Sequence, residues 1–140
     1  MVESIKELRK INEKFFVYGF EEDKNLGNVI LKNFNEKEFL QDLNSCKAVI
    51  TNGGFMLISE ALYLKKPILS IPVKKHFEQT LNAIYLERLG YGMFGKETSK
   101  EIINKFIKKI PLYRNKLKNY KKYDNKEAIR KISDAIKPSN

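Results

Sequence analysis

The sequence predicts an α/β fold in which helices flank a parallel β-sheet. Short apolar runs alternate along the chain with segments whose apolar residues recur at helical spacing. Strands covered by helices on both faces are apolar throughout, and the runs at residues 15–18, 48–51 and 68–71 have that character. A third observation is the glycine pair at residues 53–54, which separates one of these runs from the helical pattern that follows it.

The first third of the chain predicts a helix, two strands and a second helix. The strand runs are bounded by turn residues, and both helical segments place their apolar residues on one face. An acidic turn at residues 21–25 separates the two strands. The expected order is a helix around residues 5–11, strands at 15–18 and 28–31, and a helix at 36–43.

The middle of the chain repeats the order strand, turn and helix. The strand at 48–51 leads through the glycine pair into a helix that Pro67 closes, because proline cannot continue it. The strand at 68–71 ends at Pro72, and the helix that follows from residue 78 ends at Gly90, a residue common just past helix C-termini.

Beyond residue 92 the strand pattern fades. Residues 99–135 predict helices only, in two apolar stripes that Pro111 separates. A chain of 140 residues suffices for one domain, and no low-complexity linker divides it. The expectation is therefore a single domain over residues 1–140.

The net charge of +10 is unevenly distributed. Residues 1–95 carry 13 basic and 12 acidic side chains, whereas residues 96–140 carry 14 and 5. Such a basic segment is either a solvated helical face or a surface that meets anionic lipid or a phosphate-bearing partner. Charge therefore does not define the function of the first two thirds of the chain.

Targeting and metal-binding signals are weak in this sequence. No stretch approaches the roughly 20 apolar residues of a membrane span, and the acidic N-terminus does not read as a signal peptide, so a cytoplasmic location is expected. With Cys46 and His76 as the single cysteine and histidine, neither an internal disulfide nor a zinc site is expected. Cys46 is predicted to be a small buried residue.

Three polar segments follow predicted strands, at residues 32–34, 51–54 and 72–79. Ligands of open parallel sheets bind outside the carboxyl ends of the strands, so these segments are the candidate site. Amides beside Gly53 and Gly54 can approach a ligand closely, and the following helix N-terminus favours phosphate. A plain tight turn explains the glycine pair equally well.

Two further positions carry carboxylates that could recognise a sugar. Glu60 lies six residues after Gly54, where it can accept hydrogen bonds from two ribose hydroxyls; the alternative is a surface pair with Lys65 or Lys66. Glu78 and Gln79 together can hold several sugar hydroxyls, and the alternative is a helix cap. His76 has no identifiable partner that would make it a general base.

Together these segments resemble the donor-binding signature of UDP-glycosyltransferases and of the MurG-like glycosyltransferases of family 28. The similar stretches are residues 51–61, 66–72, 77–83 and 89–92. The resemblance implies the C-terminal, Rossmann-like half of a GT-B fold. It also implies a UDP-sugar donor, with UDP-N-acetylhexosamine as a candidate, and inverting transfer to a lipid-linked or polymeric acceptor.

Matching the signature residue by residue implies a role for each position. Glu60 would bind ribose, Glu78 and Gln79 the donor sugar, and Phe34, on a looser match, the neighbourhood of the uracil. Asn52 and Leu57 stand where many relatives have histidine and serine, so backbone amides would contact the phosphates instead. The implied donor-binding set is Phe34, Asn52, Gly53, Gly54, Phe55, Met56, Glu60, Glu78 and Gln79.

The resemblance also implies what this chain lacks. The opening strand, its glycine-bearing loop and the N-terminal acceptor domain are absent, so no catalytic residue can be named and the isolated chain is expected to be inactive. A missing domain or a partner chain would supply the acceptor site, at the membrane surface if the acceptor is a lipid. No metal or other cofactor is expected.

Two other functions remain compatible with the sequence. A UDP-sugar 2-epimerase has a similar fold with a Gly-Gly and Glu-Ala helix, although the segment 72–82 fits transferases better. A noncatalytic nucleic-acid-binding module, driven by the basic tail, would bind in a strongly salt-dependent manner. A helical docking domain is a further nonenzymatic possibility.

Overall fold

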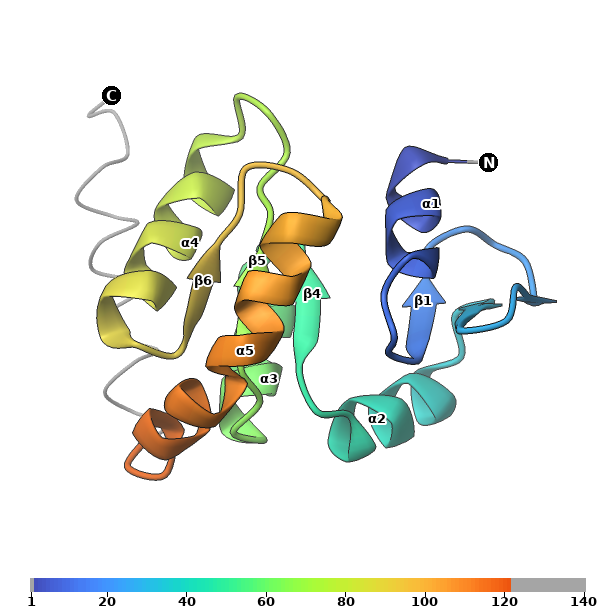
Figure 1. Cartoon of the computed structure of the whole chain (residues 1–140). Helices are drawn as coiled ribbons and strands as arrows, with labels where there is room; N and C mark the ends of the chain where they lie inside the picture. The colour runs from blue at the N-terminus through green and yellow to red at the C-terminus, as the bar shows by residue number, and fades with distance from the viewer. Residues whose placement is uncertain (1, 122–140) are drawn as a thin grey trace, which may run out of the picture.

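The computed structural model describes residues 2–121, which form two three-stranded sheets (Figure 1). In the first, of order β1-β3-β2, β1 is parallel to β3 and β2 is antiparallel to it. In the second, of order β4-β5-β6, all pairs are parallel. The strands are β1 (Phe15–Tyr18), β2 (Lys24–Asn25), β3 (Val29–Lys32), β4 (Val49–Thr51), β5 (Ile68–Ser70) and β6 (Gly92–Phe94). The α/β class is confirmed.

Five helices pack around these sheets within the described residues. They are α1 (Glu3–Arg9), α2 (Glu36–Ser45), α3 (Phe55–Tyr63), α4 (Phe77–Leu89) and α5 (Lys100–Leu117). Side chains of Asn35, His76 and Ser99 accept backbone N–H groups at the starts of α2, α4 and α5. Gly90 ends α4 in the left-handed conformation, with φ of 80°, as the sequence predicts.

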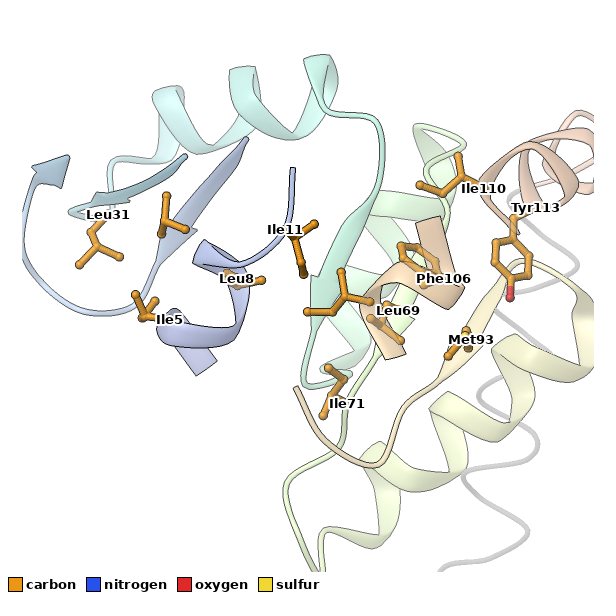
Figure 2. Packing of buried hydrophobic residues seen from close by; sticks show 12 residues of the cluster. Ile5, Leu8, Ile11, Leu31, Leu69, Ile71, Met93, Phe106, Ile110 and Tyr113 are labelled. Carbon is orange, nitrogen blue, oxygen red and sulfur yellow. The ribbon is translucent and has the colours of Figure 1, made fainter. Parts of the chain in front are cut away.

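Buried side chains form two clusters on opposite faces of the second sheet. Neighbouring residues of β5 point to different clusters, Leu69 to the first and Ile68 to the second. The first cluster extends from α1 to α5, and Figure 2 shows Leu8 and Phe106 within it. The second joins α2, α3 and α4. Because the first cluster spans both sheets, the packing of α1 and α5 holds them together.

Two of the strands are not predicted from the sequence. β2 is a two-residue antiparallel pairing within the segment expected to be only a turn. β6 has three residues and begins with Gly92, so it carries little strand signal. A Cβ at Gly92 would collide with the backbone of Ile68, and the glycine thus permits β6 to pair with β5.

The prediction that Pro111 interrupts the C-terminal helix is wrong, because α5 continues through it to Leu117. Proline inside a helix costs about 3 kcal/mol. Burial of a large apolar side chain contributes about 1.5 to 3 kcal/mol, and α5 buries several, so packing outweighs the proline. These side chains are Ile103, Phe106, Ile110, Tyr113 and Leu117. The second predicted stripe, at residues 128–136, lies outside the described residues.

Cys46, expected to be buried, is only partly buried. It follows the last turn of α2, where its Sγ donates a hydrogen bond to the carbonyl of Leu43 at 3.1 Å. Burial raises the pKa of the Cys46 thiol, so it stays protonated at neutral pH.

A cavity of about 710 Å³ lies between β1 and β4. All residues of both strands line it, together with apolar side chains such as Leu8 and Ile110. β5, which has a strand on each side, is buried at every position, whereas no residue of β1 or β4 is fully buried and Phe16 of β1 is exposed. In the described part of the chain, β1 pairs only with β3 and β4 only with β5. The facing edges of the two sheets are therefore unpaired.

Polar side chains from β1, β3 and α2 form a hydrogen-bonded cluster. The Tyr18 hydroxyl donates to Asp42 Oδ2 at 2.6 Å, and Lys32 Nζ lies 2.8 Å from the same oxygen and 2.9 Å from Glu38 Oε1. Burial raises the pKa of Tyr18, and the bond to Asp42 raises it further. Burial lowers the pKa of Lys32, but its bonds to Asp42 and Glu38 outweigh this, so the net direction is upward.

Replacing Asp42 by asparagine should lower the free energy of unfolding by about 1 to 2 kcal/mol. The substitution removes the negative charge to which Tyr18 and Lys32 both donate, and the Lys32 side chain that loses this partner is only 16% exposed. Urea denaturation measures the change. Glu36→Gln, at an exposed position of the same helix, should change stability by no more than about 0.5 kcal/mol. Equal losses in the two variants would contradict a stabilising role for the cluster.

Candidate functional site

The glycine turn lies at the carboxyl end of β4 and leads directly into α3. Asn52 is exposed at its tip, whereas Gly53 is buried and has a φ of 103°. The Gly53 amide donates to the hydroxyl of Thr51 at 3.3 Å. Gly54 is the N-cap of α3, with no side-chain hydrogen bond at the cap. Unlike α2, α4 and α5, this helix presents first-turn amides that no side chain of the described residues caps.

One face of α3 is open to solvent next to these amides. Met56 is 72% exposed, and Glu60, one turn further along the helix, is exposed as well. Six residues of helix place Glu60 about 9 Å along the axis from Gly54. Phe55, the first residue of the helix, is partly buried against the second cluster.

Within residues 2–121, the carboxylate of Glu60 has no ion pair or hydrogen bond. The alternative of a pair with Lys65 or Lys66 is wrong, because neither ammonium group forms an ion pair with Glu60 in the described residues; both bind backbone carbonyls. Lys65 Nζ donates to the carbonyl of Lys118, and Lys66 Nζ donates to those of Asn44 and Cys46. The carboxylate is thus free to accept hydrogen bonds from a ligand.

The start of α4 lies beyond the end of β5. His76, not Glu78 or Gln79, caps this helix: its Nδ1 accepts the amide N–H of Gln79 at 3.3 Å. The Gln79 side chain turns back to the preceding loop, where Oε1 accepts from the amide of Val73 at 3.0 Å. Glu78 is exposed. The Gln79 side-chain amide still has N–H donors for a ligand, but its oxygen holds the loop.

Phe34 follows β3 at the corresponding edge of the first sheet. It is 67% exposed, and its ring lies 5.6 Å from that of Phe39 and 6.4 Å from that of Tyr18, between centroids. This aromatic group gives a planar ligand an apolar surface.

β1 and β4 point in the same direction in Figure 1, so both carboxyl ends lie at one edge of the molecule. The cavity lies between these two strands, and Glu60, Glu78 and Gln79 are not among the residues that line it.

Two buried polar residues lie beneath the glycine turn, and neither is among the residues predicted from the sequence. Asn82 of α4 is 4% exposed, and its Nδ2 donates to the carbonyl of Gly53 at 3.1 Å. Ser70, the last residue of β5, is fully buried, and its hydroxyl has no hydrogen-bond partner in the part of the chain that the structure describes. The signal for Asn82 is a polar residue among the apolar positions of a helix.

The described residues contain no group of histidine, cysteine, aspartate and glutamate side chains arranged to hold a metal ion. None of the helices in residues 2–121 has the length and apolar character needed to cross a bilayer. The chemistry that the site offers is recognition. Amides at a helix N-terminus suit a phosphate, a nearby free carboxylate suits hydroxyl groups, and an exposed ring suits a planar base.

Two glycosyltransferases are among the solved structures with a similar arrangement. Spinosyn forosaminyltransferase SpnP has a TM-score of 0.67 and 14% identity, over 94% of this chain and 38% of that one. SnogD from Streptomyces nogalater has a TM-score of 0.61 and 18% identity, over 95% of this chain and 39% of its own. At these identities the likeness concerns the fold, which is that of the α/β domain of GT-B glycosyltransferases.

Sequence comparison gives the family. Residues 2–111 match the family model described as glycosyl transferase family 1, and the chain belongs to this family. An uncharacterized glycosyltransferase of Methanosarcina acetivorans is 37% identical over 113 residues, which are 75% of this chain and 30% of the relative. The predicted relation to GT-B glycosyltransferases is confirmed.

A second relative, from Bacillus cereus, is a UDP-N-acetylglucosamine–N-acetylmuramyl-(pentapeptide) pyrophosphoryl-undecaprenol N-acetylglucosamine transferase. It is 35% identical over 103 residues, which are 67% of this chain and 29% of that protein. The chain thus spans about 30% of the length of these curated relatives.

Proposed function

We propose that this chain is the donor-binding half of a glycosyltransferase and that it binds a UDP-sugar for inverting transfer to an acceptor held elsewhere. One observation carries the proposal: α3 starts with uncapped amides at a glycine turn and, on its exposed face, carries a carboxylate that has no partner among residues 2–121. A ribosyl diphosphate needs donors for its phosphates and acceptors for its hydroxyls, and α3 offers both within about 9 Å.

The remaining predicted residues complete the proposed site. The exposed ring of Phe34 would contact the base, and Glu78 with the amide N–H groups of Gln79 would contact the sugar. The relative from Bacillus cereus is named for transfer of N-acetylglucosamine from its UDP derivative to a lipid-linked acceptor. This supports a UDP-N-acetylhexosamine donor, a lipid-linked acceptor and a peripheral position at the membrane for the complete enzyme.

Isothermal titration of this chain with nucleotides tests the proposal. UDP and UDP-N-acetylglucosamine should bind, GDP and ADP should bind at least about tenfold more weakly, and EDTA should leave the affinities unchanged because the proposed site uses no metal. Addition of single-stranded DNA as a competitor should leave the affinity for UDP unchanged. Absence of UDP binding, or equal affinity for the three nucleotides, would refute a uridine-specific donor site.

The space between β1 and β4 supports a further part of the proposal, that another parallel strand lies there in a longer polypeptide. Its occupant would be an apolar segment preceding α1. α1 starts at the end of the molecule toward which β1 and β4 point, so a strand running parallel to both would end near it (Figure 1). Successive strand amides point to opposite edges, and those of Phe16, Tyr18 and Ile50 face the space.

An N-terminal extension of five alternating valine and isoleucine residues with a short Asn-Gly linker should protect these three amides from hydrogen exchange by at least about tenfold. It should also raise the melting temperature by several degrees, since it buries apolar surface and pairs two strand edges. An extension of equal length made of glycine and serine is the control. Equal protection in both proteins, or protection that depends on protein concentration and so reports self-association, would contradict an intramolecular strand.

A further inference from the structure

The glycine turn rests directly on β5 and on the first turns of α4. A Cβ added at Gly53 would lie 2.7 Å from the Ser70 hydroxyl oxygen and 3.4 Å from the carbonyl oxygen of Gln79. The turn is therefore in close contact with the two elements that carry the other half of the proposed site.

The hydrogen bond from Asn82 fixes one peptide group of this turn. Its side-chain nitrogen lies 3.1 Å from the Gly53 carbonyl oxygen and is buried, with the neighbouring Ala83 and Leu86 fully enclosed. A buried carboxamide is unfavourable unless it is hydrogen-bonded, and packing alone would favour an apolar residue at this position. The bond links residues 29 positions apart and joins α4 to the turn.

The direction of this carbonyl determines the direction of the next amide. The described residues contain no cis peptide bond, so the Gly53–Gly54 peptide is trans and its C=O and N–H point in opposite directions. The carbonyl points to Asn82 in the interior, and the Gly54 N–H consequently points away from α4. No acceptor among the described residues binds that N–H.

A peptide between two glycines rotates more easily than any other, because neither residue has a Cβ to restrict it. In the rotated state the Gly53 carbonyl would face the ligand, and its negative end would repel a phosphate. An interaction that holds the carbonyl inside would thus preserve the site for an anion.

We propose that Asn82 is a positioning residue which locks the Gly53–Gly54 peptide so that the Gly54 amide faces the diphosphate of the donor. This inference rests on the proposed function. Asn82 should affect the binding of the diphosphate only, because the proposed contacts to the base and the ribose come from Phe34 and Glu60 on other elements.

Titration of wild type and Asn82→Leu with UDP and with uridine tests the assignment. Leucine branches at Cγ, as asparagine does, but cannot donate a hydrogen bond. UDP affinity should fall about tenfold, whereas uridine affinity should change less than about twofold. The matched control is Asn44→Leu on the exposed face of α2, which should leave both affinities unchanged.

The ratio of the two affinities distinguishes positioning from general destabilisation, which would weaken both ligands. A wild-type protein that binds UDP more tightly than uridine, with an unchanged ratio in Asn82→Leu, would overturn the role of Asn82 and leave the proposed function intact. A wild-type protein that binds neither ligand would refute the proposed function, and this inference with it.

A measurement on the wild-type protein covers the case in which the variant does not fold. The backbone amide resonance of Gly54 should shift downfield on addition of UDP and remain in place on addition of uridine, since only the diphosphate accepts from it. A Gly54 resonance that UDP does not move, while other site resonances shift, would overturn the proposed orientation of this peptide.

Discussion

Gly53→Ala should lower the free energy of unfolding by about 2 to 4 kcal/mol and abolish measurable UDP binding. The φ of 103° at Gly53 is one that residues with a Cβ rarely adopt, and the new methyl group would lie 2.7 Å from the hydroxyl oxygen of Ser70. Relief of either strain moves the turn, and with it the amides at the start of α3. Urea denaturation and calorimetric titration measure the two effects.

The adjacent glycine provides the control. Gly54 has φ of −65° and ψ of 138°, which any residue adopts, and a Cβ there would meet nothing within 4 Å. Gly54→Ala should therefore change stability by less than about 0.5 kcal/mol. If it nevertheless weakens UDP binding, the methyl group obstructs a close approach of the phosphates to the backbone, which is the reason for glycine at this position in the proposed site.

A second substitution separates the steric strain from the conformational strain. Ser70→Ala alone should be neutral or slightly stabilising, because the buried hydroxyl has no hydrogen-bond partner among the described residues. Combined with Gly53→Ala, it should restore the part of the unfolding free energy that is lost through the contact with the Ser70 hydroxyl. The part lost through the unfavourable φ at residue 53 should remain lost. Equal stability of Gly53→Ala and Gly54→Ala would contradict the assigned strain.

The sequence predicts those features of the fold that depend on local chemistry. The turn at Gly53, the C-cap at Gly90 and the apolar runs that became β1, β4 and β5 are all encoded by neighbouring residues. The continuation of α5 through Pro111 is not, because it depends on side chains buried against the rest of the protein. β6 likewise depends on a long-range contact, because it can pair with β5 only if the residue next to the Ile68 backbone, Gly92, has no Cβ.

The candidate site divides in the same way. Glu60 could be proposed as a ligand-binding residue from its distance to the glycine pair along one helix. Asn82 could not, because its partner lies 29 residues away, and Gln79 could not be assigned to the Val73 amide. Long-range hydrogen bonds of this kind follow from the packing of α4 on the turn, and a single sequence does not reveal them.

Glu60→Ala should weaken UDP binding by about 1.5 to 3 kcal/mol, the value expected for hydrogen bonds to a charged group, or at least about tenfold. Glu60 is exposed and has no partner in the described residues, so its removal leaves the protein itself little changed. The fold should keep its stability within about 0.5 kcal/mol, which separates this variant from Gly53→Ala. Glu101→Ala, at an exposed position of α5, is the matched control and should bind UDP as the wild type does.

Comparison of UDP with 2′-deoxy-UDP shows whether the carboxylate of Glu60 accepts a hydrogen bond from a ribose hydroxyl. In the wild-type protein the deoxy compound should bind more weakly, because one donor is missing. In Glu60→Ala the two compounds should bind equally, since the acceptor is gone as well, and the difference between the two proteins gives the coupling energy of the hydroxyl and the carboxylate. If the variant discriminates between the compounds as strongly as the wild type does, the ribose is recognised by another group. The exposed face of α3 would then not be where the nucleoside lies.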